Sequence, residues 1–138
     1  MEASEIKDIA KKCEIFKTLD EEEFDLLLFY GELKDFASGA TVYKIGETAE
    51  GTFCLILSGS VEIVTQTGSR IRKMGPSEII GEIGATGPQN KRTVTVRAIE
   101  PTRLLEWDIK YIHTRWPPLL KKLKDQAWKH LAQYYEST

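Results

Sequence analysis

The sequence predicts a mainly β domain with helices at both ends, an α+β chain whose strands form a sandwich or a barrel. Three observations lead to this prediction: helical spacing up to residue 31, short β-branched and aromatic runs between glycines over 32–108, and renewed helical spacing from 109. The chain has 138 residues, 41% of them hydrophobic and 29% charged. This suits a single domain over 1–138, divided into 1–31, 32–108 and 109–138.

Two helices are expected in the N-terminal part. Ile6, Ile9 and Cys13 recur at helical spacing. Asp20 is a good N-cap for the second helix, and Glu23 stands three residues later, which is the spacing of a capping box.

The middle part reads as a series of short strands. The run 52–57 is almost continuously apolar, as expected of a strand with both faces covered, and 61–64 follows it after a Ser-Gly-Ser turn. Residues 93–98 alternate strictly, which predicts one buried face. Further strands are expected at 41–43 and 103–107, and many short strands of this kind are typical of a sandwich or barrel.

The C-terminal part predicts an amphipathic helix. Pro117 and Pro118 are compatible only with the start of a helix, not with its interior. The apolar positions that follow keep helical spacing: Leu120, Leu123, Ala127, Leu131 and Tyr134. This stripe must be covered: either the helix packs on its own domain, or it moves as a lid or pairs with a partner helix.

Composition excludes several classes of protein. The net charge is −2 and the basic residues form no tract, which argues against nucleic acid or an anionic membrane as the main partner. No apolar run is long enough to span a bilayer, and the acidic N-terminus lacks the apolar core of a signal peptide. Cys13 and Cys54 lie among apolar residues, so we expect buried free thiols and a cytoplasmic location.

Catalytic and metal sites are not expected. His113 and His130 are the only histidines, and both fall in the C-terminal helical part. A catalytic metal site generally requires three ligands in one place. A metal-dependent β-roll enzyme, one of three hypotheses considered, therefore lacks its histidine cluster, and we expect no enzyme, no metal and no cofactor.

One stretch concentrates polar and glycine residues in a motif. Glu82 and Arg92 stand ten positions apart, the first within Gly-Glu-Ile-Gly-Ala and the second within Arg-Thr-Val. This pattern resembles the phosphate-binding cassette of cyclic-nucleotide-binding domains, in particular the catabolite-activator type of sensor domain. The candidate ligand-binding residues are Gly81, Glu82, Ile83, Gly84, Ala85, Arg92, Thr93 and Val94.

Three further segments resemble the same family in the same order. They are the "Phe, two residues, Leu" turn in 14–19, the strand ending in Gly-Glu in 39–47 and the hairpin in 53–63. The likeness covers about residues 13–108. It implies a double-stranded β-helix, or jelly-roll barrel, with N-terminal helices and a C-terminal amphipathic helix.

The residue types suit a cyclic nucleotide, which offers an anionic phosphodiester, a ribose 2′-hydroxyl and a flat base. The guanidinium fork of Arg92 matches the phosphate, and the amides of 83–85 would add donors if they open a helical turn. Glu82 is suited to accept from the 2′-hydroxyl, while Thr93 would donate to the phosphate or to a purine edge. Gly84 allows close approach of the backbone.

Apolar residues at the mouth of the barrel are candidates for a base pocket, namely Val61, Ile63 and Ile71. A hydroxyl residue after the arginine, as at Thr93, occurs in cGMP-selective members of the family and also in cAMP binders. The likeness to the bacterial sensor domain favours cAMP over cGMP.

Alternatives remain open at this stage. Glu82 and Arg92 would also fit a purely structural ion pair, and the domain would then be a nucleotide-blind scaffold of the same fold. Val94 stands where the family usually has alanine, and Ala85 stands where a larger apolar residue is common. The family resemblance implies signalling through repositioning of the C-terminal helix. No helix-turn-helix segment, membrane span or kinase domain follows in the sequence, so we expect the output to be a protein partner or a homodimer through that helix.

Overall fold

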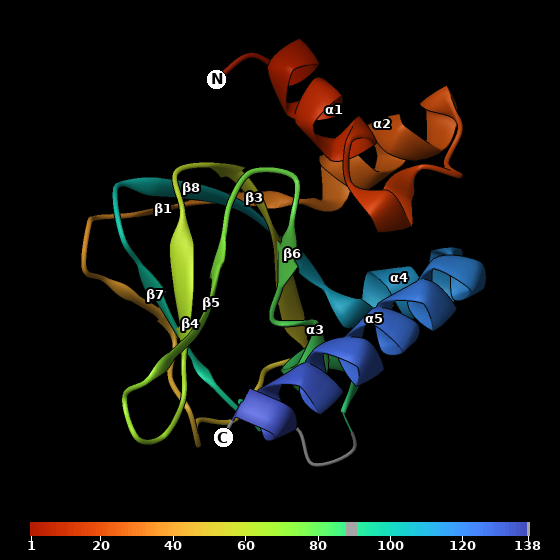
Figure 1. Ribbon diagram of the computed structural model, residues 1–138. Helices are drawn as coiled ribbons and strands as arrows, with labels where there is room; N and C mark the ends of the chain where they lie inside the picture. The colour runs from red at the N-terminus through yellow and green to blue at the C-terminus, as the bar shows by residue number, and fades with distance from the viewer. Residues whose placement is uncertain (88–90, 138) are drawn as a thin grey trace.

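The computed structural model describes residues 1–87 and 91–137, with side chains up to residue 133. Two groups of helices, one N-terminal and one mainly C-terminal, pack against the same side of a roll of β-strands (Figure 1). The helices are α1 (Ala3–Lys11), the 3-10 turn η1 (Glu14–Phe16), α2 (Glu21–Tyr30), α3 (Glu82–Thr86), α4 (Ile109–Arg115) and α5 (Pro117–Ser137).

The strands of the described residues form two four-stranded sheets. The first sheet has the order β1-β8-β3-β6 and the second has the order β2-β7-β4-β5. All pairings within both sheets are antiparallel, as expected of a jelly roll. The strands are β1 (Glu32–Phe36), β2 (Thr41–Tyr43), β3 (Thr52–Ser58), β4 (Val61–Val64), β5 (Arg70–Met74), β6 (Ile79–Ile80), β7 (Thr95–Ala98) and β8 (Thr102–Asp108).

The capping box that the sequence predicts at the start of α2 is confirmed. The Asp20 carboxylate accepts from the Glu23 amide at 2.8 Å, and the Glu23 carboxylate accepts from the Asp20 amide at 3.0 Å. Two amide groups that the helix cannot pair internally are thereby satisfied.

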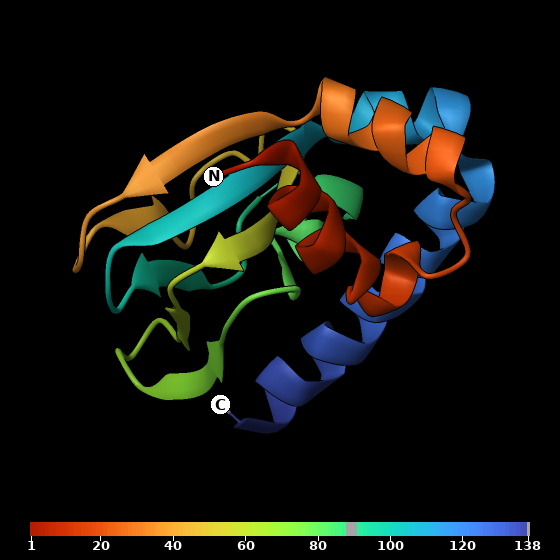
Figure 2. The ribbon, with the colours of Figure 1, turned by 90° about the horizontal axis from the view of Figure 1, so that it is seen from above.

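Strand β3 is buried on both faces, as its apolar run predicts. Phe53 and Leu55 belong to a cluster shared with the helices, which we call the helix-side core. Cys54 and Ile56 belong to a second cluster between the two sheets, which we call the inter-sheet core. The view from above shows the helices gathered on one side of the roll (Figure 2).

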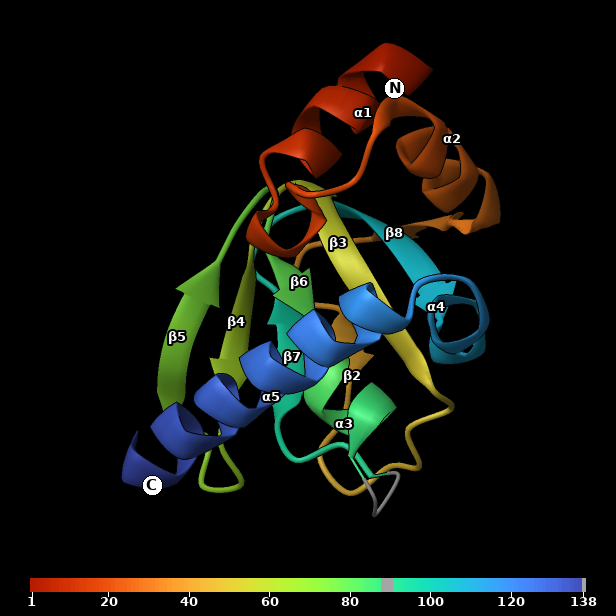
Figure 3. The same ribbon diagram turned by 90° about the vertical axis from the view of Figure 1, so that its right-hand side faces the viewer.

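Helix α5 packs on its own domain through its apolar stripe. It begins at Pro117, and Leu119, Leu123 and Ala127 are buried, the first two within the helix-side core. The helix runs diagonally across the roll, with α3 beside it and in contact with it (Figure 3). The side chain of Tyr134, the last residue of the predicted stripe, lies outside the described side chains.

Three strands were not predicted from the sequence, and each is an edge strand of its sheet. They are β1, β5 and β6. The first two carry charged residues on their exposed sides, and β6 has only two residues, so none shows a long apolar or alternating run. In the described part of the chain, no helix combines the length and the apolar character needed to cross a membrane.

Candidate functional site

The Gly-Glu-Ile-Gly-Ala motif folds into the short helix α3 and the turn before it. Gly81 caps α3 with φ of 85°, and a Cβ there would lie 2.7 Å from the Tyr43 ring. A Cβ at Gly84 would lie 2.9 Å from Arg92 Nη1 and 2.9 Å from the Cβ of Ala49. Both positions therefore require glycine, the first for its left-handed backbone as well as for the lack of space.

Arg92 is buried against the same turn, with 6% of its surface exposed. Nη1 donates to the Gly81 carbonyl at 2.9 Å, while Nη2 donates to the carbonyl and the hydroxyl of Thr52, both at 3.0 Å. The guanidinium lies over the Tyr43 ring, 3.7 Å from its centroid. Its cationic charge thus faces neutral oxygens and an aromatic face.

No ion pair joins Glu82 to Arg92, so the structural ion pair considered from the sequence is not found. Among the described carboxylates none lies within 4 Å of the Arg92 guanidinium. Glu82 is 2% exposed, and its Oε1 instead makes a hydrogen bond with Nδ1 of His130 on α5. The two charged groups of the motif therefore have different surroundings.

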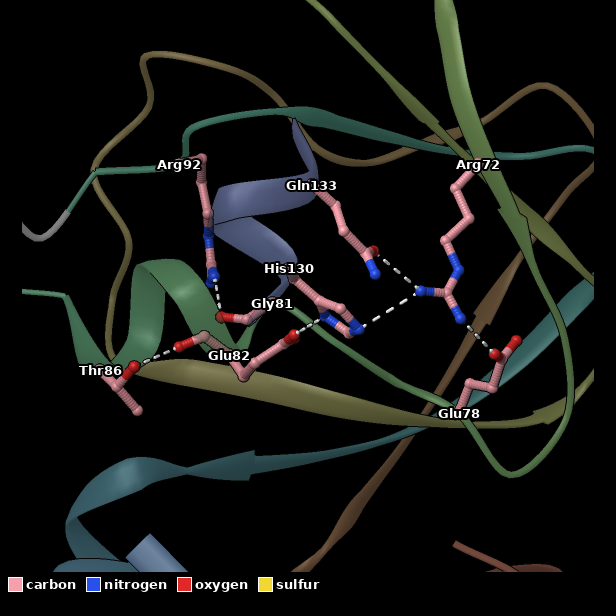
Figure 4. A network of polar contacts seen from close by, with 8 residues as sticks. All are labelled: Arg72, Glu78, Gly81, Glu82, Thr86, Arg92, His130 and Gln133. Atoms are coloured by element: carbon pink, nitrogen blue, oxygen red, sulfur yellow. Dashed lines mark hydrogen bonds and ion pairs between the residues drawn. The ribbon is translucent and has the colours of Figure 1, made fainter. Parts of the chain in front are cut away.

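His130 connects the motif to the β5–β6 turn (Figure 4). Its Nε2 lies 3.4 Å from Nη1 of Arg72, and the same Nη1 lies 3.5 Å from Oε1 of Gln133. Arg72 also donates to Oε1 of Glu78 at 3.1 Å, and Oε2 of Glu78 accepts from the Gly75 amide at 2.7 Å. A chain of polar contacts thus runs from α3 through α5 to the second sheet.

The structure brings most of the predicted residues around one small cavity of about 20 Å³. Of the eight predicted cassette residues, all but Ala85 line it, and Ala85 packs against the helix-side core. Ile63 also lines it, whereas Val61 is buried in the inter-sheet core and Ile71 packs against that core. Among the three predicted base-pocket residues, only Ile63 therefore borders the cavity.

Tyr43, which lines the cavity, forms a buried polar pair with Cys54. The Tyr43 hydroxyl is 3.1 Å from the Cys54 sulfur. Burial raises the pKa of the Cys54 thiol to about 12 and moves the pKa of Tyr43 well above its usual value. Neither group therefore adds a negative charge beside Arg92 at neutral pH.

Sequence reasoning missed four side chains of the site: Tyr43, Thr52, Arg72 and His130. Only His130 left a usable signal, because it continues the buried stripe of Leu123 and Ala127 at helical spacing. A polar residue on a buried stripe requires a partner, which in this case is Glu82. In residues 1–87 and 91–137, no three His, Cys, Asp or Glu side chains are grouped so that they could hold a metal ion.

Comparison with known families decides the classification. The family model described as "Cyclic nucleotide-binding domain" matches residues 33–114, more than half of the chain. The chain belongs to the cyclic nucleotide-binding domain family. Domains of this family are regulatory and non-catalytic, and the cassette residues discussed above fall within the matched range.

Solved structures of cyclic nucleotide-binding domains share the fold. Over 94% of this chain, the cAMP-bound PfPKA-R superposes with a TM-score of 0.83 and 20% identity, and a regulatory subunit of a cAMP-independent protein kinase A from Trypanosoma brucei with 0.81 and 20%. A putative cyclic nucleotide-binding protein from Geobacter metallireducens matches with a TM-score of 0.74 and 20% identity over 97% of this chain and 99% of its own. No curated protein matches the sequence.

This chain spans about half of the two kinase regulatory subunits, 45% and 47% of their lengths. At these identities the likeness establishes the jelly-roll fold alone.

Proposed function

We propose that this domain binds a cyclic nucleotide at the α3 turn and signals through the position of α5. The observation that supports this most is Arg92. Buried arginines are usually paired with an anion, whereas this guanidinium contacts only neutral oxygens and a ring among the described residues. A monoanionic phosphodiester would supply the missing charge.

Different cassette residues would contact different parts of the ligand. Arg92 would exchange part of its contacts with Gly81 and Thr52 for charge-assisted hydrogen bonds to the phosphate. The backbone of Ile83, Gly84 and Ala85, together with the Thr93 hydroxyl, would line the same group. Glu82 would accept from the ribose 2′-hydroxyl.

Of the two common ligands, we favour cAMP over cGMP. A structural neighbour, PfPKA-R, is described as cAMP-bound. Val94 and Ile63 border the cavity and offer apolar contacts to a purine ring. The C-terminal helix would then carry the signal to a protein partner or to a second copy of the chain.

Thermal unfolding of the purified protein with cAMP, cGMP and AMP tests this proposal. A ligand at one hundred times its Kd stabilises the folded state by about 2.7 kcal/mol. We expect a higher Tm with cAMP and no change with AMP. The phosphate of AMP is dianionic and is not closed into a 3′,5′-cyclic phosphodiester. The absence of a shift with either cyclic nucleotide at millimolar concentration would reject it.

Arg92→Ala provides the matching variant, and Arg97→Ala on β7 provides the control. Arg97 pairs with Glu62 on the surface, away from the cavity lining. We expect the ligand-induced shift to vanish in Arg92→Ala and to persist in Arg97→Ala. If Arg92→Ala kept the full shift, the nucleotide would bind without the cassette arginine, and the proposed site would be wrong. A nucleotide-blind scaffold would become the better description if the unaltered protein itself showed no shift.

A further inference from the structure

The guanidinium of Arg92 lies flat on the ring of Tyr43. Its Cζ is 3.7 Å from the ring centroid, a distance at which two planar groups are in van der Waals contact. An N–H group that pointed at the ring would hold Cζ further away. Tyr43 therefore contacts the face of the guanidinium and not its edge.

The face and the edge of a guanidinium serve different partners. All five N–H donors lie in the plane of the group and point outward along its edge. In the described part of the chain, the bonds to the Gly81 carbonyl and to the carbonyl and hydroxyl of Thr52 account for three of these donors. A phosphate that binds Arg92 exchanges bonds along this edge and does not have to displace the ring. The contact with Tyr43 is therefore compatible with both the free and the ligand-bound protein.

The ring of Tyr43 is itself held in place. The pairing of β2 with β7 shifts register between Thr41 and Tyr43, an irregularity of the kind that re-aims a side chain. Tyr43 is 8% exposed and belongs to the inter-sheet core. Its hydroxyl lies 3.1 Å from the Cys54 sulfur, and a Cβ at Gly81 would lie 2.7 Å from the ring. The surroundings of the ring thus leave it little room to move.

A guanidinium that is held on a ring is a better anion receptor than a mobile one. An arginine side chain loses rotamer freedom when it binds a ligand, and a ring that already holds it removes part of that loss before binding. The ring also blocks approach from one face. An anion must then approach in the plane, where two N–H groups can meet the two non-bridging oxygens of a phosphodiester.

We propose that Tyr43 is the positioning residue of the cassette: its ring holds the guanidinium of Arg92 flat, so that the N–H edge is already in place for the phosphate. The proposal rests on the proposed function for its ligand, but the orientation of Arg92 in the unliganded protein is measured separately.

Tyr43→Leu and Tyr43→Phe separate the ring from the hydroxyl, and Tyr30→Leu is the matched control. Leucine removes the aromatic face but remains apolar, whereas phenylalanine keeps the face. Tyr30 also has an arginine over its ring, with Cζ of Arg115 4.9 Å from the centroid, but it does not line the cavity.

The Nε–H proton signal of Arg92 in NMR spectra reports its orientation without any ligand, and the loss of this signal in Arg92→Ala identifies it. Because the proton lies over the ring, the ring current moves its signal upfield. We expect the upfield shift to persist in Tyr43→Phe and Tyr30→Leu and to be lost in Tyr43→Leu. An unchanged signal in Tyr43→Leu would overturn the proposal.

Affinity for cAMP, measured by isothermal titration, gives the second readout. We expect Tyr43→Leu to bind about tenfold more weakly than the unaltered protein, the value of a buried cation–π contact. Tyr43→Phe and Tyr30→Leu should stay within about twofold. Thermal unfolding without ligand establishes that each variant is folded.

Equal affinity of Tyr43→Leu and the unaltered protein would overturn the proposal, as would a loss in Tyr43→Phe as large as that in Tyr43→Leu. If the NMR signal behaved as expected but the unaltered protein bound no cyclic nucleotide, the proposed function would be rejected and the orientation of Arg92 by Tyr43 would stand.

Discussion

The two faces of β3 present different kinds of interior. On the helix-side core, Trp107 stacks on Phe53 and meets Phe16 edge-on, and its Nε1 donates to the Leu27 carbonyl at 2.7 Å. On the inter-sheet side, the apolar core ends in the buried charges of Arg92 and Glu82.

We expect the helix-side core to contribute mainly to stability and the inter-sheet side to contribute mainly to ligand binding. In the aromatic group of Trp107, Phe53 and Phe16, the one polar atom, Nε1 of Trp107, is bonded to the Leu27 carbonyl inside the domain. The inter-sheet side keeps a buried cation without an anionic partner among the described residues, an arrangement that costs stability and that a bound anion would offset. Substitutions on the two faces should therefore change different measurements.

The largest effect is expected from Trp107→Ala. Losing a fully buried indole and leaving the Leu27 carbonyl unpaired should reduce the free energy of unfolding by about 3–5 kcal/mol. Urea denaturation measures this, with Trp107→Phe as an intermediate control. If Trp107→Ala reduced the free energy of unfolding by less than about 1 kcal/mol, the helix-side core would not be the main source of stability.

A smaller effect is expected at the entrance of α3, where two glycines form a matched pair. Gly81 and Gly39 have the same φ of 85°, but a Cβ at Gly81 meets the Tyr43 ring whereas a Cβ at Gly39 meets nothing within 4 Å. Both alanine variants should lose about 1–2 kcal/mol to the left-handed backbone. Gly81→Ala should lose about 1–3 kcal/mol more through the clash.

Urea denaturation of both glycine variants measures that difference directly. If both variants lost the same free energy of unfolding, the Tyr43 ring would move aside without measurable cost. The inter-sheet side would then be less tightly packed than the structure indicates.

The smallest effect is expected from Tyr43→Phe. The ring, and with it the contact to Arg92, remains, while the contact to the Cys54 sulfur is lost, at a cost of about 1 kcal/mol. Tyr30→Phe on the helix side, whose ring stacks on Tyr111, is the control and should change stability by less than about 0.5 kcal/mol. If the two variants were equal in denaturation, the hydroxyl of Tyr43 would contribute nothing to the site.

Local patterns predicted the parts of the fold that depend on local physics. The capping box at Asp20, the double burial of 52–57 and the helix start at Pro117 follow from neighbouring residues, and the structure confirms them. The edge strands depend on pairing with distant segments, so their polar sequences gave no comparable signal.

The candidate site also has a part that the local sequence predicts and a part that only the fold brings together. The cassette from Gly81 to Val94 is a contiguous motif and was visible in the sequence, and the short helix expected there is present. Tyr43, Thr52 and His130 reach it from three other elements, and only the fold brings them within contact of Arg92 or Glu82. The two histidines of the chain cannot supply the three ligands of a metal site, so the sequence assigns His130 no role, although its place on a buried stripe indicates a polar partner.

Helix α5 contacts the rest of the domain in two different ways along its described length. Its first half packs into the helix-side core, and its second half is held by the hydrogen bond between His130 and Glu82. Leu123 lies in the helix-side core, and at 1.5 Å per residue His130 lies about 10 Å further along the axis. A pivot of about 10° at Leu123 would displace His130 by roughly 2 Å, enough to break its hydrogen bond to Glu82. One broken contact at the cassette would thus become a larger sweep of the helix beyond it, with the core around Leu123 left undisturbed.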